Sequence, residues 1–328
     1  MNHWTANPRL RSFRNLLFAI VAIWFAQYLA NIFAVTLNTG QWFPPLYFTF
    51  LLLFYIAVFG GMGSVLDGQS HPYKAMGLAP RPGWGEEIAV GAAVGWAMVV
   101  AVVGIIAIGG GLRIGFDRSA LSWGALGINV ITLLLASLAE EIAFRGYPFQ
   151  RLIEVTGPVT AVLISSLAFG LVHAGNPDAT PQSVAVTVLS GVLFSVAYLR
   201  TRALWLGWGL HFAWNFALAV IFGLPMSGIW RYSTVVQTHA RGPLWLTGGD
   251  YGPEASLTAA VVLFIGIWVV VRVTRDYAWR YGQPEIVPGG IPVDIGGHPP
   301  VAGFPPPAAV APEAKPADEN GLVQIQLK

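Results

Sequence analysis

Five polar side chains lie within stretches of sequence that are otherwise apolar enough to span a membrane. Two of them are the adjacent glutamates Glu140 and Glu141, and the others are His173, His211 and Asn215. An ionisable side chain near mid-membrane costs about 2.5–3.5 kcal/mol, so such residues usually face a cavity and act there. A carboxylate beside imidazoles can take a proton from water, while polar neighbours stabilise the charge that develops on a carbonyl. These residue types indicate hydrolysis of a peptide bond.

The same side chains also suit a metal ion. Histidine and glutamate are ordinary zinc ligands, and three protein ligands plus water are the usual catalytic arrangement. Glu140, His173 and His211 would supply three ligands to Zn²⁺, and a metal-free water activated by Glu140 is the alternative. The sequence leaves both open. Asn215 would be an unusual zinc ligand, so we assign it to hydrogen bonding, either at the oxyanion or as an orienting group.

Spacing separates the two glutamates. Glu141 and Arg145 are four residues apart on one predicted helix, a distance at which opposite charges touch. We expect this ion pair to support the helix end and to leave Glu140 free. His211 and Asn215 have the same spacing, so both project from one face of a later helix.

Helix geometry predicts that Glu140 faces His173. A turn is expected at Gly157, which follows Glu140 by 17 residues and precedes His173 by 16. At a rise of about 1.5 Å per residue, both side chains lie about 25 Å from the turn on antiparallel helices. Phe169 shares a helix face with His173 and is expected to support it. With His211, these residues would converge in one water-filled pocket.

Such a pocket needs a framework of membrane-spanning helices. Only 10% of the 328 residues are charged, 55% are hydrophobic and the mean hydropathy is +0.61, whereas a soluble domain carries roughly a quarter charged residues. A span needs about 20 mostly apolar residues. The sequence therefore predicts an all-α polytopic membrane protein with about eight transmembrane helices around a central polar cavity. The expected spans are 13–36, 43–66, 88–110, 122–144, 158–174, 183–199, 203–223 and 255–274.

Basic residues predict the orientation of these helices. With the N-terminus in the cytoplasm, twelve Lys and Arg residues fall on the cytoplasmic side and four on the other, and the C-terminal tail holds the remaining two of eighteen. Because cytoplasmic loops are enriched in Lys and Arg, we expect both termini to be cytoplasmic, in a bacterial cytoplasmic membrane. The first apolar run, of about twenty residues, exceeds the ~7–15 residues of a signal-peptide core, so we expect it to remain uncleaved.

Composition divides the chain into three regions. We predict a cytoplasmic segment over 1–12, a transmembrane domain over 13–280, and a disordered cytoplasmic tail over 281–328, which is rich in proline and glycine. Residues 225–254 are expected to form a non-cytoplasmic loop outside the bundle. The net charge of +2 gives no reason to expect a nucleic-acid partner, and the absence of cysteine excludes disulfides and thiolate catalysis.

Three short motifs resemble those of the CPBP family, the CAAX proteases and bacteriocin-processing enzymes. "EEIAFRG" (140–146) fits the family's EExxxR motif, "FGLVH" (169–173) fits FxxxH and "HFAWN" (211–215) fits HxxxN. They occur in the family's order within a core of roughly 120–223. The resemblance implies an eight-helix intramembrane endopeptidase, related to the Ras-converting enzyme that removes the last three residues of prenylated CAAX proteins.

The resemblance also implies a role for each motif residue. Glu140 would activate water, His173 would assist it, and His211 and Asn215 would form the oxyanion or metal side. The supporting residues would be Glu141, Arg145 and Phe169. The partner would be a membrane-bound protein or peptide, including lipidated ones, cleaved near its C-terminus or in its membrane-proximal part.

Two other function classes use similar polar clusters. A transporter can carry Glu and His relays inside the membrane, usually with matching broken helices in its two halves. In this sequence the polar cluster lies in the second half, without a counterpart in the first. A non-catalytic scaffold or immunity protein of the same family is the other alternative.

Overall fold

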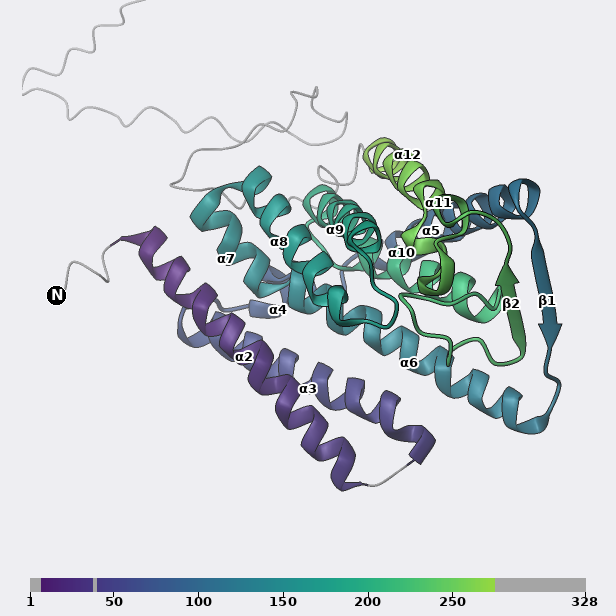
Figure 1. Cartoon of the computed structure of the whole chain (residues 1–328). Helices are drawn as coiled ribbons and strands as arrows, with labels where there is room; N and C mark the ends of the chain where they lie inside the picture. Colours follow the sequence, from purple (N-terminus) through teal and green to yellow (C-terminus); the bar gives the residue numbers. More distant parts are fainter. Residues whose placement is uncertain (1–6, 38–39, 275–328) are drawn as a thin grey trace, which may run out of the picture. The chain divides into compact units, whose positions relative to one another are not determined.

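The computed structural model describes residues 7–37 and 40–274, which form helices joined by loops and one two-stranded sheet (Figure 1). The predicted tail, 281–328, lies outside the described residues. The longer helices are α2 (Pro8–Thr36), α3 (Phe43–Val65), α5 (Trp84–Gly109), α6 (Ala120–Arg145), α7 (Tyr147–Thr156), α8 (Pro158–Val172), α9 (Pro181–Thr201), α10 (Trp205–Phe216) and α12 (Leu257–Val273). The shorter elements are η1 (Gly40–Trp42), α4 (Pro72–Ala75), β1 (Leu112–Phe116), η2 (His173–Gly175), the π-helical η3 (Ala217–Ile221), β2 (Val236–Ala240), α11 (Leu244–Thr247), η4 (Gly249–Tyr251) and η5 (Pro253–Ala255).

Eight apolar helical segments coincide with the eight predicted spans. Six of them are long and apolar enough to cross a membrane: Pro8–Thr36, Gly40–Val65, Trp84–Gly109, Ala120–Thr156, Pro158–Gly175 and Pro181–Thr201. Two shorter apolar helices, Trp205–Ile221 and Leu257–Val273, complete the set over the described part of the chain. The prediction of a polytopic helical membrane protein is therefore confirmed.

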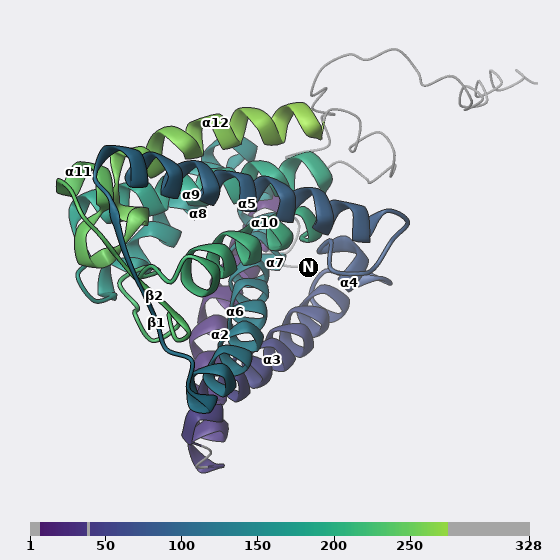
Figure 2. The same cartoon turned by 90° about the vertical axis from the view of Figure 1, so that its right-hand side faces the viewer.

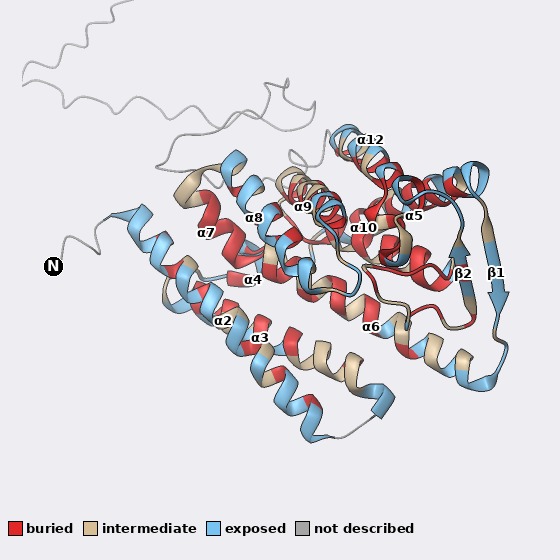
Figure 3. Ribbon diagram, viewed as in Figure 1, coloured by how far each residue is buried: buried red, intermediate tan, exposed pale blue. Residues whose placement is uncertain are grey.

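The outward faces of these helices carry large apolar side chains. Figure 3 shows exposed residues along the outer sides of α2, α8 and α12. Trp24 on α2 and Phe264 on α12 are 68% and 64% exposed. Soluble proteins rarely expose contiguous apolar patches of this extent. We therefore interpret these surfaces as the faces that contact lipid.

A two-stranded sheet joins two segments that the sequence analysis placed in loops. β1 and β2 pair antiparallel, with Leu112 opposite Ala240 and Phe116 opposite Val236. The predicted helical fold thus also contains one short sheet. The pairing ties the segment after α5 to the 225–254 loop and fixes part of that loop against the helices.

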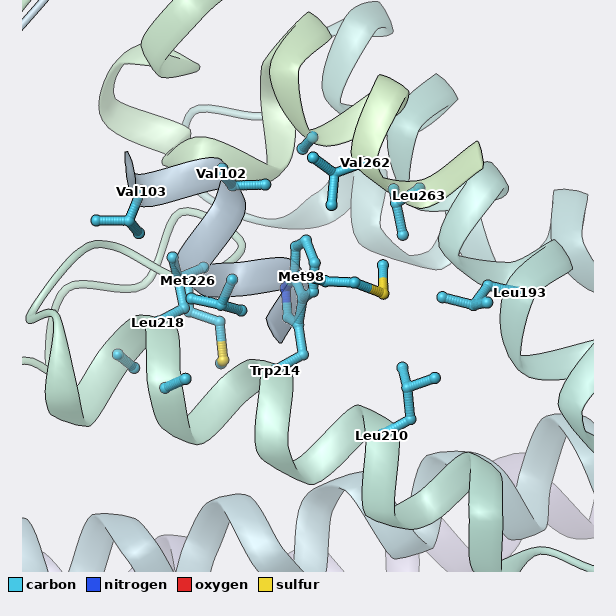
Figure 4. Packing of buried hydrophobic residues seen from close by; sticks show 14 of the residues in the cluster. Met98, Val102, Val103, Leu193, Leu210, Trp214, Leu218, Met226, Val262 and Leu263 are labelled. Atoms are coloured by element: carbon cyan, nitrogen blue, oxygen red, sulfur yellow. The ribbon is translucent and has the colours of Figure 1, made fainter. Parts of the chain in front are cut away.

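Helix α6 lies between two apolar cores. From top to bottom in Figure 2, the helices follow in the order α12, α5, α10, α6 and then α3 with α2. In the first core, Met98 of α5 packs between Trp214 of α10 and residues of α12 (Figure 4). The second core includes Phe59 of α3. Leu133 of α6 belongs to the first core, and Ala139 and Ile142 belong to the second, so α6 contributes to both cores.

Glycines allow α10 to pack closely along α5. A Cβ atom at Gly91 or Gly95 of α5 would lie 2.2 or 2.4 Å from the backbone oxygens of Leu206 and Leu210 on α10. A Cβ at Gly209 would likewise lie 2.4 Å from the oxygen of Ile88. Small residues four apart are the usual means by which membrane helices approach each other. The segment "GAAVG" (91–95) contains this signal, which the sequence analysis did not use.

A break after α6 corrects the predicted hairpin geometry. α6 ends at Arg145, and α7 follows as a separate helix after Gly146, where a Cβ atom would lie 2.4 Å from the oxygen of Ile142. α7 ends at Thr156 and is followed by Gly157, which has φ +85°. The predicted depth of Glu140 assumed one continuous helix up to Gly157, and that assumption is wrong. Packing of α6 between its neighbours sets the position of Glu140 instead.

The glycine contact yields a first prediction. Gly95→Val should force α10 away from α5, because the added methyl groups would overlap the Leu210 backbone. Overpacking of this kind costs about 1–3 kcal/mol. We expect a clear drop in the thermal midpoint of the detergent-solubilised protein, followed by tryptophan fluorescence. Gly104→Val on the same helix is the control, because no atom lies within 4 Å of its added Cβ. Equal midpoints for the two variants would contradict this packing.

Candidate active site

A buried ion pair organises the C-terminal half of α6. The Arg145 Nη1 atom lies 3.4 Å from Glu141 Oε1, and both side chains are almost fully buried. Arg145 Nη2 also donates to the backbone oxygen of Gly191 on α9, at 3.0 Å. Its guanidinium carbon lies 4.5 Å from the ring centroid of Phe169 and 5.2 Å from that of Phe194. The predicted i, i+4 pair is present, and it links α6 to α8 and α9.

Glu141 also orients His211. Oε1 of Glu141 lies 2.9 Å from His211 Nδ1. An ionised carboxylate accepts hydrogen bonds and donates none. Nδ1 therefore carries the hydrogen, and Nε2 is the ring atom left for other partners. The ring of Phe194 stacks on this imidazole, with centroids 4.5 Å apart. Gly207 leaves room for the carboxylate, since a Cβ atom there would lie 3.2 Å from Glu141 Oε2.

His173 is oriented in a similar way at the end of α8. Its Nδ1 atom lies 2.7 Å from the backbone oxygen of Phe169. Because a carbonyl oxygen only accepts, Nδ1 donates and Nε2 is again the free ring atom. The rings of Phe169 and His173 are 4.7 Å apart. Phe169 therefore contacts both Arg145 and His173, which gives the predicted supporting residue a physical role.

Glu140 differs from its neighbour in its surroundings. Its Oε2 atom is buried but accepts no hydrogen bond from a described residue. It lies 3.7 Å from His211 Nε2, too far for a direct hydrogen bond. The side chain as a whole keeps 34% of its surface exposed, against 1% for Glu141. Glu140 is therefore the glutamate with a carboxylate oxygen available to a further molecule.

The predicted reactive residues line one internal cavity of about 200 Å³. Glu140 comes from α6, His173 from the end of α8, and His211 and Asn215 from α10. α10 continues directly into the π-helical η3, and such turns often occur at functional sites. The predicted central polar cavity is present, and the four residues meet there although their three helices are far apart in sequence.

The 225–254 loop also contributes to this cavity, which the sequence analysis did not foresee. Ser227, Arg231 and Glu254 are among the lining residues. Glu254 accepts hydrogen bonds from Trp214 Nε1 at 2.8 Å and from Ser227 Oγ at 2.8 Å. The expectation of a loop outside the bundle is therefore wrong. Only the charge of Glu254 next to the last span could have drawn attention to it, because its partners are distant in sequence.

The three proposed zinc ligands line the same cavity but do not form a preformed metal site. Among the described residues, no three His, Asp or Glu side chains are grouped closely enough to hold a metal ion. His211 Nδ1 is directed to Glu141 and His173 Nδ1 to a backbone oxygen, which leaves one ring nitrogen of each for other partners. A zinc ion held by Glu140, His173 and His211 therefore stays a prediction, and the roles below are those of the side chains themselves.

Fold and cavity together define a class: a polytopic membrane protein in which a carboxylate, two imidazoles and an amide line one internal cavity. A model of the family described as type II CAAX prenyl endopeptidase Rce1-like matches residues 122–217. All seven predicted site and supporting residues fall within that range. Residues 122–217 are thus similar to the Rce1-like family, and the predicted resemblance to CPBP intramembrane proteases is confirmed.

A curated relative shows a similarity of the same kind. The chain is 31% identical over 86 residues to "Putative membrane peptidase YdiL" of Bacillus subtilis (strain 168). The similar region covers 26% of this chain and 33% of that protein, so the chain spans about one third of the relative's length. No solved structure matches the chain.

The contrast between the two glutamates yields a second prediction. Glu141→Gln should destabilise the protein by about 3–5 kcal/mol, because Arg145 would remain buried without its counter-charge. Glu140→Gln should change the free energy of unfolding by less than about 1 kcal/mol, because its carboxylate makes no hydrogen bond within the described residues. Equilibrium unfolding in mixed micelles measures both. Equal destabilisation of the protein by the two substitutions would contradict the different roles of Glu140 and Glu141.

Proposed function

We propose that this protein is an intramembrane endopeptidase of the CAAX type, in which Glu140 activates the attacking water. The observation that carries the proposal is the buried, unpartnered Oε2 atom of Glu140 beside two oriented histidines in one cavity. The family match over residues 122–217 supports a peptidase rather than a transporter or scaffold. The substrate would be a membrane-associated protein or peptide, cleaved near its C-terminus or in its membrane-proximal part.

The attacking water would be held between Glu140 and His173. Glu140 takes one proton from the water, whose oxygen then forms a bond to the carbonyl carbon of the scissile peptide. His173 has Nδ1 committed to the Phe169 carbonyl, so Nε2 accepts a hydrogen bond from the same water and orients it. Neither residue needs to move far, because both already line the cavity.

The developing oxyanion would be stabilised on the α10 side. The Asn215 amide donates a hydrogen bond there, and His211 donates from Nε2 when that atom carries a proton. As the tetrahedral intermediate collapses, the C–N bond breaks and Glu140 passes its proton to the leaving nitrogen. One water is consumed, and the products are a new carboxyl group and a new amine. Glu141 and Arg145 position His211 and take no proton.

The membrane location of the protein is also part of the proposal. The apolar helices and the family match support an integral membrane protein. The excess of Lys and Arg on one side of the predicted spans supports cytoplasmic termini. We place the protein in a bacterial cytoplasmic membrane, where its substrates would be lipidated or membrane-spanning chains.

The third prediction tests the role of Glu140. The substrate is an internally quenched peptide with an S-farnesylated cysteine followed by three C-terminal residues. Glu140→Gln should lower its cleavage by about 10²–10⁴-fold. The loss follows from removing the proton acceptor, so KM should change little. Purified protein in lipid nanodiscs provides the measurement. Comparing membrane-peptide fragments between wild-type and Glu140→Gln cells would then identify natural substrates.

A matched control makes this test specific. Glu86 is an exposed carboxylate in the first turn of α5 and does not line the cavity. Glu86→Gln removes the same charge and should cleave the peptide at the wild-type rate. Equal cleavage by wild-type and Glu140→Gln protein would rule out the proposed mechanism.

The fourth prediction concerns metal dependence. Because the described residues form no three-ligand group, we expect purified active protein to hold less than one zinc ion per chain. Cleavage should persist after treatment with 1,10-phenanthroline. Elemental analysis and the peptide assay on the same preparation measure both quantities. Loss of cleavage with chelator and its recovery on adding Zn²⁺ would show instead that a metal completes the site.

A further inference from the structure

A second cavity adjoins the one that holds the reactive residues. It has a volume of about 470 Å³ and is lined by residues of α2 and of the start of α3, including Gln27, Asn31 and Tyr47. Phe48 and Arg231 line this outer cavity and also the inner one. A substrate chain that occupies both cavities would therefore contact Arg231 where the cavities meet.

Among the described residues that line the two cavities, Arg231 is the only arginine or lysine. Its position is fixed by its surroundings: the backbone oxygen accepts a hydrogen bond from Asn129 Nδ2 at 3.0 Å, and the guanidinium carbon lies 5.3 Å from the Tyr232 ring centroid. Nη2 also lies 3.4 Å from the Tyr232 hydroxyl. The residue is exposed, so its charged head is held by a neighbouring ring while it stays accessible.

No carboxylate of a described residue lies within 4.0 Å of the Arg231 guanidinium, although two glutamates line the inner cavity. Glu254 is already engaged by Trp214 and Ser227. Glu140 is the residue proposed to activate the attacking water. The guanidinium therefore retains its capacity for an external anion, and its planar fork matches a carboxylate in two parallel hydrogen bonds.

We infer that Arg231 determines specificity by binding a carboxylate of the substrate, which fixes how far the chain extends into the inner cavity. The inference rests on the proposed peptidase function. The carboxylate comes either from the free C-terminus of the substrate or from an Asp or Glu side chain near it. By holding that group, Arg231 selects which peptide bond lies against Glu140, so it is a specificity residue and takes no part in proton transfer.

Three versions of one probe distinguish the sources of the carboxylate. The probe is the S-farnesylated peptide with a free C-terminus, the same peptide as the C-terminal amide, and the amide with Asp as its last residue. Binding of each to Glu140→Gln protein in nanodiscs gives Kd without turnover, and cleavage by protein with Glu140 intact gives kcat and KM. A charge-assisted hydrogen bond predicts that a probe with the recognised carboxylate binds about tenfold more tightly than the plain amide.

The variant series isolates Arg231 from general charge effects. Arg231→Gln should abolish the tenfold preference and raise KM with kcat unchanged, and Arg231→Lys should restore part of it. Arg241→Gln removes the same charge from the same loop at an exposed position that lines neither cavity, and should keep the preference.

Each outcome bears on the inference separately from the peptidase assignment. Preference for the free C-terminus alone, or for both acidic probes over the plain amide, supports it and names the source. Equal or absent binding of the three probes by protein with Arg231 intact overturns it, and so does a preference that survives Arg231→Gln. Cleavage that does not depend on Glu140 would instead refute the proposed function, because the binding comparison does not require turnover.

Discussion

The site depends on one buried interaction, the ion pair between Glu141 and Arg145. Burying a lone guanidinium is strongly unfavourable, so the pair forms only with close geometry and further hydrogen bonds. Here Arg145 donates a hydrogen bond to the backbone oxygen of Gly191 and packs against the ring faces of Phe169 and Phe194. The same two rings contact the histidines, Phe169 that of His173 and Phe194 that of His211. Satisfying one buried charge therefore fixes α6, α8, α9 and α10 relative to each other.

This constraint explains why adjacent glutamates differ. Successive residues on a helix point about 100° apart, so only one of the two can face Arg145. Glu141 does so and also receives the hydrogen of His211 Nδ1. Glu140 then points into the cavity with an oxygen that no described residue satisfies. One residue of sequence separates a structural carboxylate from a reactive one.

Local spacing made much of this predictable from sequence. The i, i+4 relations of Glu141 with Arg145 and of His211 with Asn215 depend only on helix geometry, and the eight apolar segments depend only on length and composition. The helix break at Gly146 and the strand pairing of β1 with β2 depend on contacts between distant segments. Arg231 and Glu254 also line the cavity because of contacts between distant segments. No sequence pattern within the 225–254 loop indicates which helices the loop packs against.

The central claim is that Glu141 holds the site together while Glu140 reacts. A double-mutant cycle in the free energy of unfolding tests it most directly, with Arg145→Met combined in turn with Glu141→Gln and with Glu140→Gln. We predict a coupling energy of about 1–3 kcal/mol for the pair with Glu141, and additivity within about 0.5 kcal/mol for the pair with Glu140. Coupling of Arg145 to Glu140 instead of Glu141 would contradict the account.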